Sequence, residues 1–109
     1  KKFLQRIYTN DELKKSKSIK NKISFFSKRF AAKEAFSKAL GTGFRKGLHF
    51  KDISISNDKL GKPSIKINKK LKELVTKKFN IKKIKIYLSI SDEKKYSIAF
   101  VTLGANEVK

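Results

Sequence analysis

The sequence predicts an α+β fold in which a long central helix packs on an antiparallel sheet of hairpins. Apolar residues recur at helical steps over residues 23–40, which predicts the helix. Apolar and polar residues alternate in four later segments, which predicts the strands of two hairpins. Because 109 residues suffice for one modest domain but not for two, we expect a single domain over residues 1–109.

A short first helix is predicted to begin near residue 10. Thr9 and Glu12 match a capping box, in which each side chain accepts a hydrogen bond from the backbone of the other residue. The Lys- and Ser-rich segment that follows, residues 14–22, is typical of a solvated helix end or loop.

Two apolar stripes run along the predicted long helix. Their members recur at steps of three or four residues: Ile23, Phe26 and Phe30 in one stripe, and Ala32, Phe36 and Leu40 in the other. Two stripes predict a helix that is buried over a broad face. The helix should end at Gly41, since glycine is the common residue just after a helix C-terminus.

The second half of the chain predicts hairpin, helix, hairpin. Alternating apolar residues at 53–55 and 65–67 flank a turn at residues 57–63. Residues 69–79 fit a short amphipathic helix with Leu71, Leu74 and Val75 facing inward. Alternation over residues 84–90 and 96–103 predicts two longer paired strands around a turn at 91–95.

The composition is strongly basic. The formal net charge is +20, which favours polyanionic partners. Three of the 29 basic residues are Arg, the residue that bidentate recognition of nucleic acid favours. A background excess of Lys on solvated faces and a selected anion-binding surface both explain this balance. Cys is absent, and no apolar run is long enough to cross a membrane, so we expect a cytoplasmic protein with no membrane partner.

Glu34 is the most informative single residue, because it is a carboxylate within an apolar and basic helical pattern. One explanation is an exposed pair with Lys38 one turn later. The other, which the apolar neighbours favour, is a partly buried carboxylate. Nearby cations lower the pKa of such a group and make it a poor general acid, but it suits a hard cation. Mg²⁺ is commonly held by one or two carboxylates together with substrate phosphates. Lys38, Lys33 and Arg29 would then supply positive charge that faces those phosphates.

Several motifs together resemble the bacterial holo-[acyl-carrier-protein] synthases, of the 4′-phosphopantetheinyl transferase superfamily. Residues 29–43, RFAAKEAFSKALGTG, resemble the central signature of that family. Gly61-Lys62-Pro63 resembles its hairpin turn, and residues 88–92 and 96–101 resemble its closing hairpin. Residues 3–9 with Glu12 resemble the segment upstream, so the similarity runs nearly end to end.

The resemblance implies transfer of 4′-phosphopantetheine from coenzyme A to a serine of an acidic apo acyl carrier protein, with release of adenosine 3′,5′-bisphosphate. It implies dependence on Mg²⁺, a homotrimer with active sites between subunits, and a role in fatty acid biosynthesis. Glu34 would be a metal ligand, and Lys38 would lie beside the coenzyme A phosphates. The cofactor-binding residues that it implies are Arg29, Phe30, Ser37, Lys38, Gly41, Lys62, Pro63, Ser64 and Asp92.

The sequence departs from the family pattern in two places. The first strand of the family carries a metal-binding Asp, and this sequence begins after it, so we expect the second metal ligand in that strand. Many members have His where this chain has Asp92, which argues against a role for an imidazole there.

A small basic nucleic-acid-binding module is the alternative function, because a basic α+β domain is typical of that class. Its aromatic residues are expected on inward stripes, whereas base stacking needs them on an exposed sheet face. We therefore expect no nucleic-acid partner. A trimer without enzymatic activity is a third possibility, given the expected absence of the first strand.

Overall fold

The computed structural model describes residues 2–41, 49–92 and 97–108. Two short helices, α1 (Lys2–Ile7) and α2 (Asn10–Ser16), precede the long helix α3 (Lys22–Leu40). A short 3₁₀ turn, η2 (Phe50–Asp52), leads into the hairpin of β1 (Ile53–Asn57) and β2 (Pro63–Ile67). Helix α4 (Lys69–Phe79) then connects to the hairpin of β3 (Ile81–Asp92) and β4 (Ser97–Val108).

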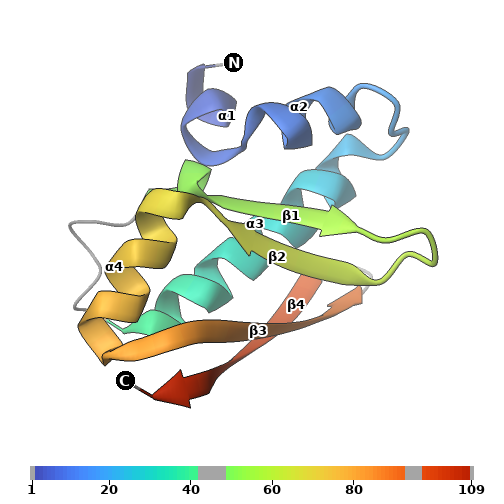
Figure 1. Ribbon diagram of the computed structural model, residues 1–109. Coiled ribbons are helices and arrows are strands. Elements are labelled where there is room, and N and C mark those ends of the chain that lie inside the picture. The colour runs from blue at the N-terminus through green and yellow to red at the C-terminus, as the bar shows by residue number, and fades with distance from the viewer. Residues whose placement is uncertain (1, 42–48, 93–96, 109) are drawn as a thin grey trace.

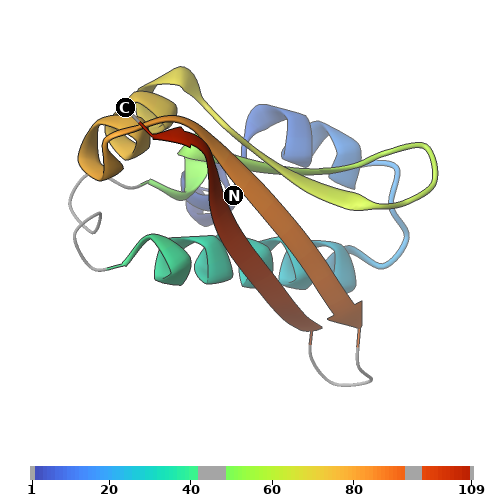
Figure 2. The same ribbon diagram turned by 60° about the horizontal axis from the view of Figure 1, so that its bottom comes forward.

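The long helix lies against both hairpins (Figure 1). Strands β1, β3 and β4 all contact α3, and β2 runs beside β3. Helices α1 and α2 lie along one side of the β1–β2 hairpin, and α4 lies at the end opposite to the turn of that hairpin (Figure 2). This arrangement confirms the predicted α+β class and the central position of the long helix.

Each hairpin forms its own two-stranded antiparallel sheet in the part of the chain that the structure describes, rather than one continuous sheet. Ile53 is opposite Ile67 in the first sheet, and Leu88 is opposite Val101 in the second. The predicted pairing is therefore confirmed. β3 continues to Asp92, so the predicted turn begins later than expected, and residues 93–96 lie outside the described residues.

The core is built around the second of the two stripes predicted on α3. Ala32, Phe36 and Leu40 are buried together with residues of both β1–β2 strands and of α4. The first stripe was wrong at Ile23, which is 82% exposed in the first turn of α3, whereas Phe26 and Phe30 are half-buried. The inward positions of the N-terminal half of α3 are instead Phe25, Arg29 and Lys33, at steps of four. Two of these are cations, so apolar periodicity alone does not identify that face.

Helix α4 begins and ends as its residues dictate. The Asn68 side chain accepts from the Leu71 backbone N–H at 2.9 Å, which caps the first turn. Asn80 ends the helix in the left-handed region, at φ 54°. Leu71 and Val75 are buried as predicted, but Leu74 is 40% exposed, because the packed side of this short helix is a single stripe at steps of four.

One expectation about the aromatic residues was also wrong. Tyr87 and Phe100 are 57% and 65% exposed on the β3–β4 sheet. Phe100 is opposite Ser89, two residues after Tyr87, so both aromatic rings lie on the same face of the sheet. Ile98 lies on this face too, since side chains two residues apart on a strand point the same way. We call Tyr87, Ile98 and Phe100 the outer apolar face.

Candidate functional site

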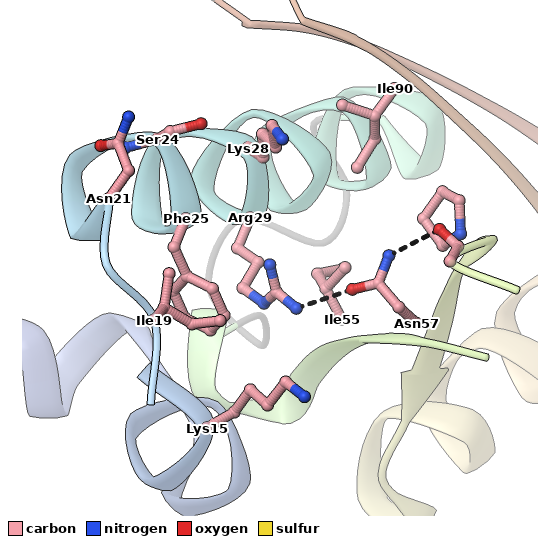
Figure 3. Close-up of a pocket in the computed structure, with 12 residues that line it drawn as sticks. Lys15, Ile19, Asn21, Ser24, Phe25, Lys28, Arg29, Ile55, Asn57 and Ile90 are labelled. Atoms are coloured by element: carbon pink, nitrogen blue, oxygen red, sulfur yellow. Dashed lines mark hydrogen bonds between the residues drawn. The ribbon is translucent and has the colours of Figure 1, made fainter. Parts of the chain in front are cut away.

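A pocket of about 400 Å³ lies between the N-terminal half of α3 and the β1–β2 hairpin. Figure 3 shows its lining, in which Arg29 of α3 points toward Asn57 at the end of β1. Phe25 and Ile55 form its apolar walls, and Gly61 and Pro63 bring the hairpin turn to its edge. Lys15 and Lys28 also line it, so the pocket is basic.

Arg29 is the central group of this pocket, and it is only 7% exposed. Its Nη2 donates to Asn57 Oδ1 at 2.9 Å, and its guanidinium carbon lies 3.8 Å from the centre of the Phe25 ring. Burial lowers the pKa of this guanidinium, while the charge of Glu12 opposes that effect. Its Nε is buried without a hydrogen-bond partner among the described residues. A buried donor without a partner is costly, which favours an anion or a polar ligand at this position.

The hairpin turn is held in register with Arg29. Asn57 Nδ2 donates to the Gly61 carbonyl at 3.0 Å, so Asn57 links the guanidinium to the turn (Figure 3). Asp58 Oδ1 accepts from the backbone N–H groups of Leu60 and Lys62, at 2.9 and 2.8 Å. Gly61 has φ +88°, a conformation that disfavours other residues. The Gly-Lys-Pro turn is therefore shaped by its own side chains and backbone.

The structure brings together part of the predicted cofactor-binding set. Arg29 and Pro63 line the same pocket, although 34 residues separate them in the sequence. Lys62 and Ser64 lie exposed in the same hairpin, and Ser64 Oγ is 3.2 Å from Ser56 Oγ. Asp92 ends β3, and its side chain lies outside the described part of the structure.

The remaining predicted residues extend from the middle of α3 to its C-cap and do not line this pocket. Phe30 packs edge-on against Phe50, with ring centres 5.6 Å apart. Ser37 Oγ donates to the Lys33 carbonyl at 2.9 Å. Gly41 ends α3 with φ +91°, as predicted.

Glu34 and Lys38 are both exposed on α3. The expectation that Glu34 would be partly buried was therefore wrong, because its apolar neighbours face other directions around the helix. No ion pair joins Glu34 to Lys38 among the described residues. An exposed carboxylate remains available to a metal ion or a partner.

The buried acid of this fold is Glu12, which is 2% exposed and lies next to the fully buried Lys33. Lys33 Nζ donates to Glu12 Oε1 at 2.6 Å, to the Ile7 carbonyl at 2.7 Å and to the Phe50 carbonyl at 3.0 Å. Glu12 Oε1 also accepts from Thr9 N, which completes the predicted capping box, and Glu12 Oε2 accepts from Ile55 N. We call this group the Lys33–Glu12 node.

The sequence placed Glu12 in the capping box and in the upstream segment of the family, and it predicted Lys33 as positive charge that faces the phosphates. The prediction for Lys33 was wrong, because its side chain is fully buried and its three N–H donors are used within the protein. The signal that could have found the pair is the position of Lys33, one turn after Arg29 and one residue after the buried Ala32. A cation at an inward helix position needs a carboxylate partner. Burial lowers the pKa of Lys33, and its hydrogen bond to Glu12 opposes that effect.

Within residues 2–41, 49–92 and 97–108, no group of three or more His, Cys, Asp or Glu side chains could hold a metal ion. In the same residues, no helix is long and apolar enough to cross a membrane. Glu34 therefore belongs to no such group among these residues, and Mg²⁺ can take one or two protein carboxylates when substrate phosphates complete its shell.

Residues 1–101 match the 4′-phosphopantetheinyl transferase superfamily. This chain belongs to that superfamily. The holo-[acyl-carrier-protein] synthase of Pelagibacter ubique is 58% identical over 101 residues, which cover 93% of this chain and 79% of that protein. The synthase of Zymomonas mobilis is 46% identical over 105 residues, which cover 94% and 78%. The family predicted from the sequence is confirmed.

Solved structures of the superfamily share the fold. The holo-[acyl-carrier-protein] synthase from Neisseria meningitidis superposes with a TM-score of 0.82 at 38% identity, covering 95% of this chain and 81% of that one. The synthase from Bacillus anthracis, solved in complex with coenzyme A (3′,5′-ADP), has a TM-score of 0.76 at 36% identity and covers 99% and 82%. The superfamily fold is therefore present across nearly the whole chain.

Proposed function

We propose that this chain transfers the 4′-phosphopantetheine group of coenzyme A to a serine of apo acyl carrier protein. The products are holo carrier protein and adenosine 3′,5′-bisphosphate. The observation that carries the proposal is the 58% identity to a holo-[acyl-carrier-protein] synthase over most of both chains. The basic pocket of Arg29 supports it, because a nucleotide cofactor that carries several phosphates needs such a site.

The pocket is proposed to bind the phosphate-bearing end of coenzyme A. Arg29 has a buried Nε without a partner, and Lys15 and Lys28 add positive charge to the same lining. Phe25 and Ile55 supply apolar walls for the rest of the nucleotide. Lys62, Pro63 and Ser64 would contact coenzyme A from the hairpin turn.

The reaction transfers one phosphate-linked group from coenzyme A to the carrier protein. The serine oxygen of the carrier protein forms a bond to the β-phosphorus and its proton passes to solvent. The bond from that phosphorus to the bridging oxygen breaks, and the bisphosphate leaves with the electron pair. Such a displacement depends on in-line positioning and on neutralising the charge of the pyrophosphate. Lys38, exposed on α3 one turn after Glu34, would stabilise the phosphate charge.

Glu34 is the residue proposed to hold Mg²⁺. When bound, Mg²⁺ would supply a Lewis acid that neutralises phosphate charge. The fit rests on an exposed carboxylate with a lysine one turn away, and Mg²⁺ commonly takes one or two carboxylates beside substrate phosphates.

A homotrimer with active sites between subunits is proposed as the working form. Two observations support it. Arg29 and Pro63 line the pocket while Glu34 and Lys38 lie outside it, so a second copy could complete the site. The outer apolar face, with Phe100 65% exposed, offers a surface for that copy. Sedimentation of the chain and of Phe100→Ser tests this, and a wild-type monomer would contradict it.

The acidic carrier protein would meet a chain of net charge +20, which speeds encounter between opposite charges. The rate of transfer at low carrier concentration should therefore fall as salt rises. A cytoplasmic place in fatty acid biosynthesis follows from the proposed substrate.

The substitution Glu34→Gln tests the proposed metal ligand. We expect the fold to be kept, because the side chain is exposed, and Mg²⁺-dependent transfer to fall by about 100-fold or more. Conversion of apo to holo carrier protein, followed by mass spectrometry, measures it. The control is Glu73→Gln, which neutralises an exposed carboxylate on α4. Full transfer by Glu34→Gln would refute the role of Glu34.

A further inference from the structure

The Lys33–Glu12 node occupies the point where five elements meet. Lys33 is on α3, Ile7 ends α1, Glu12 is on α2, Phe50 begins η2 and Ile55 is on β1. The three hydrogen bonds of the Lys33 ammonium use all three of its N–H donors. No donor of the Lys33 side chain is left for a ligand, so the node is not a binding site.

The node fixes the rotation of α3 about its own axis. Consecutive residues of an α-helix point about 100° apart, so an ammonium anchored at three acceptors also sets the direction of Glu34, its neighbour. Three hydrogen bonds of defined direction specify this angle more sharply than apolar packing does, because burial of apolar surface has no direction.

The node also ties α3 to the strand that carries the pocket. Glu12 Oε2 accepts from Ile55 N at 2.9 Å, two residues before Asn57, which accepts from Arg29. Arg29 and Lys33 thus anchor successive turns of α3 to the same strand, through an amide and a carboxylate. The pocket and the exposed carboxylate of Glu34 are held in one frame by these two anchors.

We propose that Lys33 and Glu12 are positioning residues for phosphopantetheinyl transfer, acting through the orientation of Glu34 relative to the Arg29 pocket. The inference rests on the proposed function. It assigns to a buried ion pair a role beyond stability, since apolar residues could fill the same volume and stabilise the fold at least as well. A displacement of about 1 Å at a reacting centre commonly costs about 100-fold in rate.

The experiment compares Lys33→Met and Glu12→Gln with the double variant Glu12→Gln/Lys33→Met. Lys33→Met leaves a buried carboxylate without its cation, so its melting temperature should fall most. The double variant carries neither charge and should regain much of that stability. We expect kcat to stay about 100-fold low in the double variant, with the KM for coenzyme A within about threefold of wild type.

The KM should change little because Arg29 keeps its own bond to Asn57. A readout besides activity is Mn²⁺ binding in the presence of coenzyme A, followed by electron paramagnetic resonance, which should weaken in the double variant. The matched control is Tyr8→Phe, which removes the hydrogen bond from Tyr8 to the Phe26 carbonyl of α3 but keeps the ring that lies 5.2 Å from Lys33 Nζ. It should lose stability and keep kcat.

The inference would be overturned if the double variant recovered kcat and Mn²⁺ binding together with stability. The role of the pair would then be structural only. If Lys33→Met does not fold, Glu12→Gln alone decides the question. A wild-type kcat in Glu12→Gln would refute the positioning role, and a low kcat in a stable Glu12→Gln would support it. Failure of the proposed function is seen separately, as a wild-type chain that transfers nothing, and the inference falls with it.

Discussion

Two cations of α3, one turn apart, are buried in different ways. Lys33 is enclosed, with every donor used and a carboxylate 2.6 Å away. Arg29 stands at a pocket, stacks on Phe25 and keeps one buried N–H without a partner among the described residues. A buried charge whose bonds are complete serves the architecture, whereas one whose bonds are incomplete indicates a place for a ligand.

Glu12 and Glu34 also differ in burial. The Glu12 carboxylate is buried and accepts hydrogen bonds from three groups, namely Thr9 N, Lys33 Nζ and Ile55 N. Glu34 is exposed, and it is the carboxylate that the superfamily resemblance assigns to the metal. Under the proposed assignment of Glu34, burial does not mark the functional acid in this fold. Its exposed position suits an ion that is shared with a substrate.

The largest expected effect concerns Lys33, the cation that is fully enclosed. Lys33→Met should lower the free energy of unfolding by about 3–5 kcal/mol, because it leaves Glu12 as an uncompensated buried charge. Urea denaturation followed by circular dichroism measures it. A loss below about 1 kcal/mol, in the range of exposed pairs, would show that the node is not closed to water.

A smaller effect concerns Arg29, the cation at the pocket. Arg29→Lys keeps the charge but loses the planar fork and the stacking on Phe25, so the KM for coenzyme A should rise about tenfold. Stability should change by less than in Lys33→Met. Steady-state kinetics measures the KM, and Arg6→Lys, the same change on the exposed surface of α1, is the control. An unchanged KM for Arg29→Lys would remove Arg29 from the coenzyme A site.

The smallest effect concerns the contact between Tyr8, the residue after α1, and helix α3. Tyr8 Oη donates to the Phe26 carbonyl at 2.9 Å, and its loss in Tyr8→Phe should cost about 1 kcal/mol of stability. Thermal denaturation at neutral pH measures it.

The pH dependence of the same bond has a defined sign. Burial, with a smaller contribution from the charge of Glu12, raises the pKa of Tyr8 from 10.0 to about 12. The folded state then keeps a proton that the unfolded chain loses, so stability is lost as pH rises from 10 to 12. Tyr8→Phe should lose less over that interval, and parallel pH profiles for the two proteins would contradict the shift.

Local signals predicted the elements of this fold well. The capping box at Thr9, the stop at Gly41, the helix at residues 69–79 and the alternation of both hairpins were all confirmed. Each depends on residues close in sequence. The helix α1 was missed, because its six residues carry no cap or long periodic pattern.

The site was less predictable, because it depends on contacts between distant residues. The motif placed Arg29 and Pro63 among the coenzyme A residues, and the structure brings both to one pocket. Apolar periodicity could not show that Arg29 and Lys33 face inward, since it counts cations as exposed. Glu34 was expected to be partly buried because its sequence neighbours are apolar. Those neighbours face other directions around the helix, so they do not cover it.

The double use of Glu12 has a consequence for the order of folding. Its capping box spans three residues and can form early, but its bonds to Lys33 and Ile55 close over 21 and 43 residues. Dehydrating the carboxylate before the ammonium arrives is unfavourable, so α2, α3 and β1 must dock in one cooperative step. The amide hydrogens of these three elements should therefore exchange as a single unit. The opening of that unit should cost more free energy than fraying of the chain ends.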